Sequence, residues 1–347
     1  MSQAPQDEMG RSPVAKDVAL RAGVSTSTVS RVFSGTAEVR ADKKAAVLQA
    51  AKELGFVANG AARSLSTRRF MAVGAVMPNM ENEVFIRALS TFQEGLRRAG
   101  YTLLLSHAGY DLEDEMREAG FLLDRGIDGL MLVGDIHRPA LLERIERQRM
   151  PLVQTFSLSQ ERACVGFDNR AAGARAANYL LDLGHRRIGA VTGTRRENDR
   201  GGARLQGIVD ALAARGLALR PGHDIEVHAY GIAAGRDALR QMFSSAESPP
   251  TAVICGTDQI AFGVIIEAKG RGLELPGDLS VIGFNDADYA PFLEPSLTTL
   301  RIHPAEIGRA AADYLVAKMA GRPAVRLTEI DAELILRGST APPRELG

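Results

Sequence analysis

The chain has 347 residues, 45% of them apolar, and its 42 basic residues balance 42 acidic ones. This length is enough for two or three domains of ordinary globular composition. With only Cys164 and Cys255, a disulfide framework and a CxxC motif are both excluded, which favours a reducing compartment. No apolar run is long enough to span a membrane, and the polar start MSQAPQDEMGRSP is not typical of a signal peptide. We therefore expect a cytoplasmic protein, associated with the nucleoid if it binds DNA, and no membrane partner.

The zero net charge hides an asymmetry. Residues 11–69 hold eleven basic and four acidic side chains, a net charge of +7, so the remaining residues carry −7. A small basic unit on a larger acidic body suggests a polyanionic partner for the small unit. A solvated basic face without a partner would give the same charge count.

Residues 14–35, VAKDVALRAGVSTSTVSRVFSG, have the pattern of two short helices around a turn at Gly23. Ser25 is a good N-cap for the second helix. The residues expected to face inward are Val14, Val18 and Ala22 in the first helix and Val29 and Val32 in the second. The outward face of the second helix then carries small polar residues and one arginine.

A third helix is expected over ADKKAAVLQAAKELGF, ending at Gly55. Its expected buried stripe is Ala46, Val47, Ala50, Ala51 and Leu54. Two helices around a glycine turn form a helix-turn-helix, in which the second helix enters the major groove of DNA. An ordinary three-helix bundle with a polar surface fits the same pattern.

From Met71 onward, strand-like apolar runs alternate with segments of helical period. The runs before Asp168 are MAVGAVMP, YTLLLSHA, IDGLMLVG and PLVQTF, and those after it are RIGAVTG, DIEVHAY, TAVICG and LSVIGF. This alternation predicts parallel sheets with helices on both faces. Two such series predict two doubly wound subdomains with a cleft between them. Ligands of such sheets bind beyond the carboxyl ends of the strands.

The sequence lacks the motifs of common enzyme classes. It contains no GxGxxG, no GxxxxGK[ST] and no GxSxG, and its six histidines are scattered without metal-ligand spacing. Both cysteines lie in apolar strand-like runs, which is typical of buried thiols. We therefore expect no catalytic activity, no cofactor and no metal.

Many segments, in order, resemble the LacI/GalR family of transcriptional repressors. They are KDVALRAGVSTSTVSRVFSG and ELGFVANGAARSL near the N-terminus, and VGAVMPNMENEVF, GIDGLML, VGFDN, LGHRRIGAVTG, RLQGIVDAL, TDQIAFG, LPGDLSVIGFND and LILRGST in the body. The resemblance covers the whole chain. It implies an all-α helix-turn-helix headpiece and an α/β body similar to periplasmic binding proteins. It also implies a homodimer that reads a pseudo-palindromic operator in double-stranded DNA.

The resemblance places base contacts on Thr26, Ser27 and Arg31, at the start of the second helix and one turn further on. Arginine can pair with guanine through two hydrogen bonds, and hydroxyl groups can contact several base edges. Thr28 and Ser30 are expected closer to the phosphate backbone.

Residues 59–69, NGAARSLSTRR, would form a short hinge helix that is marginal alone and orders on DNA. Asn59 can cap this helix, and Ala62 and Arg63 would lie at the DNA. The resemblance implies that Leu65 wedges between base pairs in the minor groove.

Residues at expected strand ends and the helices that follow are the candidates for contact with a small ligand. They are Asn79, Asn82, Phe85, Phe156, Arg200, Arg204, Asp258, Asn285 and Asp286. Arg204 matches the family's ligand-binding arginine. NEVF differs at two positions from the family's usual NPFF, and Phe156 stands where the family often has Asp. For the polar candidates, capping or turn formation is the alternative role.

Arg200 precedes Arg204 by four residues, so one helical turn would place both on one face. Two guanidinium groups at a cleft favour a carboxylate or phosphate over a neutral sugar, unless Glu197 and Asp199 neutralise them. NEVF, LLSHAGY and VGFDN also resemble the gluconate-repressor branch of the family. A sugar acid is therefore the favoured effector, with a neutral sugar, a sugar phosphate or a purine as alternatives. A sugar-binding module without a role on DNA is the alternative from another class.

The expected boundaries are a disordered tail over 1–12, the headpiece over 13–58, the hinge helix or linker over 59–69, a first body subdomain over 70–168 and 298–328, a second over 169–297 and 329–341, and a tail over 342–347. The chain would thus cross between subdomains near Asp168, near residues 297–299 and near Thr328.

Overall fold

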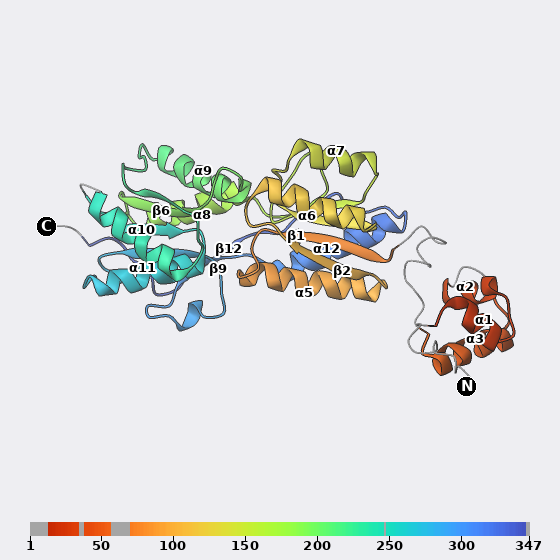
Figure 1. The fold of residues 1–347 in the computed structure, drawn as a ribbon. Coiled ribbons are helices and arrows are strands. Elements are labelled where there is room, and N and C mark those ends of the chain that lie inside the picture. The colour runs from red at the N-terminus through yellow and green to blue at the C-terminus, as the bar shows by residue number, and fades with distance from the viewer. Residues whose placement is uncertain (1–12, 35–37, 57–69, 246–247, 345–347) are drawn as a thin grey trace, which may run out of the picture. The chain divides into compact units, whose positions relative to one another are not determined.

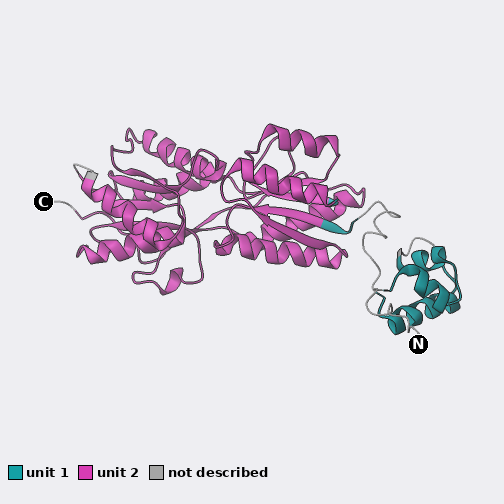
Figure 2. Cartoon of the chain, viewed as in Figure 1, with its two compact units in different colours: residues 1–72, 126–128 teal, residues 73–125, 129–347 magenta. Residues whose placement is uncertain are grey.

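The computed structural model describes residues 13–34, 38–56, 70–245 and 248–344. The chain forms two compact units, residues 1–72 with 126–128 and residues 73–125 with 129–347 (Figure 2). Within the described ranges, no helix is both long enough and apolar enough to cross a membrane.

The headpiece contains the three predicted helices, α1 (Ala15–Arg21), α2 (Thr26–Ser34) and α3 (Ala41–Leu54). Gly23 has a φ of +65° between α1 and α2, a left-handed conformation that favours glycine. The Ser25 hydroxyl accepts the backbone N–H of Thr28 at 3.2 Å, so it caps α2 as predicted. Gly55 ends α3 in the left-handed conformation, also as predicted.

The headpiece core differs from prediction at two residues. Val18, Val29 and Val47 are fully buried, but Val14 is 42% exposed because it precedes α1 rather than lying within it. Ala46 is exposed as well. At about 100° per residue, Ala46 lies roughly 90° from the centre of the stripe formed by positions 47, 50, 51 and 54.

The first lobe of the body is a six-stranded sheet in the order β11-β5-β4-β3-β1-β2. Its strands are β1 (Ala72–Met77), β2 (Thr102–His107), β3 (Gly129–Val133), β4 (Leu152–Thr155), β5 (Cys164–Gly166) and β11 (Leu327–Glu329). The helices are α5 (Glu83–Arg98), α6 (Leu112–Asp124), α7 (Pro139–Arg147) and α12 (Pro304–Met319). Figure 1 shows helices on both faces of this sheet, as strand–helix alternation predicts.

The second lobe repeats this architecture with the strand order β12-β10-β9-β8-β6-β7. Its strands are β6 (Ile188–Gly193), β7 (Asp224–Val227), β8 (Ala252–Cys255), β9 (Ser280–Asn285), β10 (Thr298–Arg301) and β12 (Glu333–Ile335). The helices are α8 (Asn169–Asp182), α9 (Asp199–Ala213), α10 (Ile232–Ser245), α11 (Asp258–Gly270) and a 3₁₀ turn over Ala290–Phe292. β12 pairs antiparallel to β10, an exception to the predicted parallel pairing.

The second crossing between the lobes lies later than predicted. β10 pairs with β9 and β12 in the second sheet, so the expected boundary between residues 297 and 298 is wrong. The chain leaves this lobe only after Arg301, and α12 then packs on α5 and on strands of the first sheet. An apolar run shows that a strand exists but not which sheet it joins, which is why the sequence misplaced β10.

Helices α8 and α9 pack at backbone contact through two glycines. A Cβ on Gly173 would collide with the backbone of Arg204, and a Cβ on Gly207 would collide with the carbonyl oxygen of Arg170. The two helices can approach this closely only because neither glycine carries a side chain. This packing fixes α9, the helix that carries both candidate arginines.

Candidate DNA-binding face and ligand cleft

The outward face of α2 carries the five residues expected to meet DNA. Those exposed to solvent are Thr26, Ser27, Ser30 and Arg31. Thr28 is half-buried, and its hydroxyl lies 2.9 Å from that of Ser25, within the N-cap. Val29 is buried behind this face, so α2 presents polar groups outward and apolar groups to the headpiece core.

The hinge residues Asn59, Ala62, Arg63 and Leu65 lie outside the residues that the structure describes. Their expected roles at the minor groove therefore stay predictions.

Replacing Arg31 with alanine is expected to weaken operator binding by about 1–3 kcal/mol, roughly 5- to 150-fold, because a bidentate contact to a base would be lost. Fluorescence anisotropy with labelled operator at one fixed salt concentration measures this effect. Lys52→Ala, which removes an exposed charge from α3, is the matched control and should change affinity far less. Equal operator affinity of Arg31→Ala and the parent chain would contradict the assignment.

The two lobes meet at a cleft that contains two adjoining cavities. The smaller has a volume of about 40 Å³ and contains the two arginines of α9. Its predicted lining residues are Asn82, Phe85, Phe156, Arg200, Arg204 and Asn285. The larger, of about 310 Å³, contains Asp258 and Asp286 and shares Asn82 and Asn285 with the smaller. The structure thus brings eight of the nine predicted ligand residues to the cleft.

Arg204 lines the smaller cavity and is held by several contacts. Its Nε donates to Asn169 Oδ1 at 2.9 Å, and its Nη1 donates to the Gly256 carbonyl at 3.1 Å. The guanidinium also stacks over the Phe284 ring at 3.8 Å. Burial lowers the pKa of Arg204 to about 10, and the charge of Arg200 adds to this shift. Arg204 therefore stays protonated at neutral pH and is held in one orientation.

Arg200 is only 6% exposed and has a partner within the protein. Its Nη1 lies 3.0 Å from Asp199 Oδ1, the ion pair that the sequence left as the alternative to ligand binding. Arg200 nevertheless lines the smaller cavity one helical turn from Arg204. The cavity is therefore less positive than two arginines alone would make it.

The two asparagines after β1 differ in position. Asn79 Oδ1 accepts the backbone N–H groups of Glu81 at 2.7 Å and Asn82 at 3.2 Å, which is the turn-forming role. Asn79 lines neither of the two cleft cavities. Asn82 caps α5 by accepting from the N–H of Val84 at 3.1 Å, yet it also lines both cavities.

Phe85 and Phe156 form an aromatic wall of the first lobe. Their ring centroids are 5.0 Å apart with an edge-to-face angle of 80°. Phe156 follows β4 with a φ of +65°, and both rings are almost fully buried while lining the smaller cavity. The residue that replaces the family's Asp at this position thus contributes apolar surface to the cleft.

Asp258 and Asp286 line the larger cavity but are already bonded within the protein. Asp258 accepts the Thr299 hydroxyl and the Ala287 N–H, each at 2.6 Å, and burial raises its pKa to about 6. Asp286 accepts from Arg301 at 2.7 Å and from Arg337 at 2.6 Å. Asp286 thus links the end of β10 to the segment just after β12, near the crossings between the lobes. This is a structural role, the alternative to ligand contact that the sequence left open.

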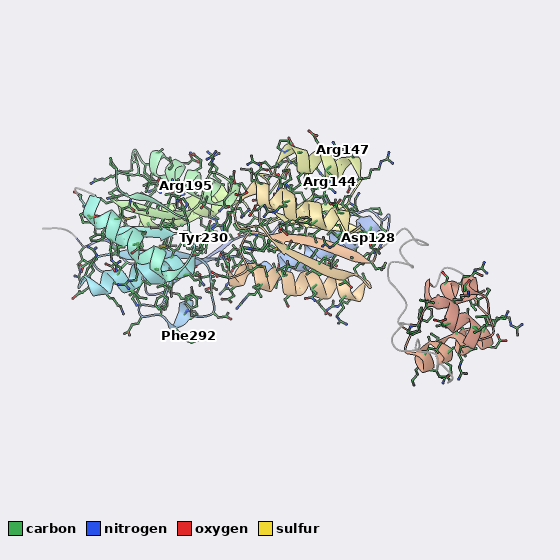
Figure 3. All side chains as sticks on the ribbon, viewed as in Figure 1. Asp128, Arg144, Arg147, Arg195, Tyr230 and Phe292 are labelled. Carbon is green, nitrogen blue, oxygen red and sulfur yellow. The ribbon has the colours of Figure 1, made fainter. Side chains whose placement is uncertain are left out.

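The sequence reasoning missed three residues at the centre of the cleft. Tyr110 from the first lobe and Tyr230 from the second stack with ring centroids 5.0 Å apart. Figure 3 labels Tyr230, which lies where the two lobes meet. Asn198, just before α9, donates to the Tyr230 hydroxyl at 3.0 Å, and its buried Oδ1 has no hydrogen-bond partner among the described residues. Tyr110 follows β2, Tyr230 follows β7 and Asn198 precedes α9. Ligands of such sheets bind beyond the strand ends, so these positions were the signal that could have identified the three residues.

Both the headpiece and the two-lobed body match known protein families. Residues 15–59 match the bacterial regulatory proteins of the lacI family, and residues 177–340 match a periplasmic binding protein-like domain. The HTH-type transcriptional repressor CytR of Escherichia coli K12 is 33% identical over 330 residues, covering 94% of this chain and 95% of CytR.

Solved structures give the same result. A LacI family regulator from Silicibacter pomeroyi superposes with a TM-score of 0.84 at 26% identity, covering 94% of this chain and 99% of the other. The transcription regulator GntR from Chromobacterium violaceum has a TM-score of 0.73 at 29% identity, with coverages of 78% and 99%. From its helix-turn-helix headpiece, its two-lobed body and these matches, the chain belongs to the LacI family of DNA-binding transcriptional repressors.

Proposed function

We propose that this repressor responds to a sugar acid bound in the cleft between its lobes. The observation that carries the proposal is Arg204, a half-buried cation whose Nη2 has no hydrogen bond within the described residues. Asp199 already pairs with Arg200, so the smaller cavity offers one uncompensated positive charge. A single guanidinium matches a carboxylate better than a doubly charged phosphate, and it gives a neutral sugar no charge-assisted bond.

The groups around Arg204 suit the hydroxyls of a sugar acid. Asn82, Asn198 and Asn285 line the smaller cavity and can both donate and accept hydrogen bonds. The space itself is tight, because about 40 Å³ holds little more than one water molecule. A six-carbon acid would therefore also use the adjoining cavity or part the stacked pair of Tyr110 and Tyr230.

Calorimetric titration of the full chain tests this proposal. Gluconate and related aldonates are expected to bind, while the matching neutral sugars bind at least tenfold more weakly because they lack the carboxylate. Sugar phosphates and purines complete the panel. Binding of only neutral sugars or only purines would contradict the proposal.

For DNA, we propose that Thr26, Ser27 and Arg31 contact bases and that Thr28 and Ser30 lie near phosphate. Asn59, Ala62, Arg63 and Leu65 would act in the hinge at the minor groove. We also propose that the protein acts in the cytoplasm, associated with the nucleoid, because its proposed partner is double-stranded DNA. Selection of bound DNA from a random pool, with and without gluconate, identifies the operator and shows whether the ligand releases or promotes binding.

We further propose that the chain acts as a homodimer on a pseudo-palindromic operator. An edge strand of the body supports this. β2 is an edge strand on which Leu105 is 44% exposed, and Phe292 is 87% exposed at the 3₁₀ turn (Figure 3). The unpaired backbone groups of an edge strand can bind a second chain, which is the feature that supports a partner on this face.

A further inference from the structure

Two carboxylates beside the cleft reach from the second lobe to the first. Asp199, at the start of α9, accepts the backbone N–H of Asp135 at 3.1 Å and also the hydroxyl of Ser157. Asp135 follows β3 and Ser157 follows β4, so Asp199 is bonded to two loops of the opposite lobe. Its side chain is only 19% exposed, which limits competition from water for these hydrogen bonds.

Glu197 makes a second pair of contacts across the cleft. Its Oε2 accepts the backbone N–H of Leu112 at 3.2 Å, and its Oε1 lies 3.4 Å from Arg138 Nη2. Leu112 is the first residue of α6, where a negative charge interacts favourably with the helix dipole. Two acids separated by one residue thus contact four residues in three segments of the first lobe: the loop between β3 and α7, the loop after β4 and the start of α6.

Asp199 also forms an ion pair with one of the two arginines of the cleft. The carboxylate that binds the first lobe is the same one that pairs with Arg200 at 3.0 Å. A ligand carboxylate in the cleft would do both things at once, neutralising a guanidinium and bridging the lobes. Asp199 therefore makes, within the protein, the contacts of a bound acid.

We propose that Glu197 and Asp199 form a latch that holds the two lobes closed when no ligand is bound. This proposal rests on the ligand cleft proposed above, because the latch would regulate access to that cleft. Lobe closure in the free protein does not depend on which ligand binds. A ligand shifts the balance between closed and open states only by its differential affinity for them. The latch sets where that balance lies before any ligand arrives.

The test measures the interlobe distance in the full-length chain without ligand. Ala140 on α7 and Ala213 on α9 are both exposed and can be replaced by spin-labelled cysteines, whereas Cys164 and Cys255 are buried. Double electron–electron resonance then measures the distance between the two spin labels. Labelled chain is diluted with unlabelled chain, so that only distances within one chain are recorded. Glu197→Ala and Asp199→Ala are each expected to give longer and broader distance distributions than the parent.

Amide hydrogen exchange provides a second readout. In Glu197→Ala the amide of Leu112, and in Asp199→Ala that of Asp135, should exchange at least about tenfold faster, since each loses its acceptor. Asp210→Ala is the matched control: this acid of α9 pairs with Arg170 inside the second lobe, so neither readout should change. Glu197→Ala leaves the pair of Asp199 with Arg200 intact, which separates the latch from the loss of a buried ion pair.

If both variants keep the parent's distance distribution, the latch proposal is overturned. If the distributions change but gluconate fails to bind the parent chain, the latch stands and the sugar-acid proposal fails. The two proposals therefore fail separately.

Discussion

Arg204→Ala should bind the sugar acid about 10- to 150-fold more weakly than the parent, since the charge-assisted hydrogen bond from Nη2 would contribute roughly 1.5–3 kcal/mol. Operator binding without ligand should stay intact, because α2 lies in the separate headpiece unit. The ligand should therefore lose its effect on operator affinity. Calorimetry for the ligand and anisotropy for the operator measure the two effects.

Two further variants sharpen this test. Arg204→Lys keeps the charge but loses the planar fork, so its ligand affinity should lie between those of Arg204→Ala and the parent. Arg215→Ala removes a half-exposed arginine just beyond α9, whose partner is Asp182, and should leave ligand binding unchanged. A parent-like ligand response from folded Arg204→Ala would rule out the assigned role of Arg204.

Asp258 should make stability depend on pH. Burial raises the pKa of Asp258 from 3.8 to about 6 in the folded chain, so the folded state binds a proton more tightly than the unfolded state does. The stabilisation from its protonated form is complete below about pH 4 and is lost as the pH rises through 6. A shift of this size corresponds to about 3 kcal/mol across the whole window.

The measurement compares the parent with Asp258→Asn by urea unfolding at several pH values. Between pH 5 and pH 7.5 the parent should lose about 1–2 kcal/mol of unfolding free energy relative to the variant. A difference between parent and Asp258→Asn that does not vary with pH would show that Asp258 has no raised pKa.

The sequence predicted the elements of the fold well because each carries a local signal. The turn at Gly23, the cap at Ser25 and the end of α3 at Gly55 depend on the conformation of one or two residues, which the residue type reveals. Strand β10 was assigned to the wrong lobe because sheet membership depends on distant partners. Ala46 lies outside the core because burial depended on the exact rotation of α3 rather than on the apolar character of the residue.

The candidate site was predictable only in part, for the same reason. Arg204 carries its signal in a short motif, whereas Tyr110 and Tyr230 lie in separate lobes and meet only when the chain folds. No local pattern distinguishes Asn79, which forms a turn, from Asn82, which reaches the cleft. The pair of Arg200 with Asp199 was foreseen only as an alternative, because adjacent residues on a helix need not face one another.

The close glycine contact between α8 and α9 restricts which wall of the cleft can change shape. Because Gly173 and Gly207 leave no room for adjustment, Arg204 has a fixed position relative to α8. A change of ligand preference during evolution would then have to come from the opposite wall, where Asn82 and Phe85 begin a separate helix. We expect the acid anchor to persist among close relatives of this repressor while the groups that read the remainder of the ligand diversify.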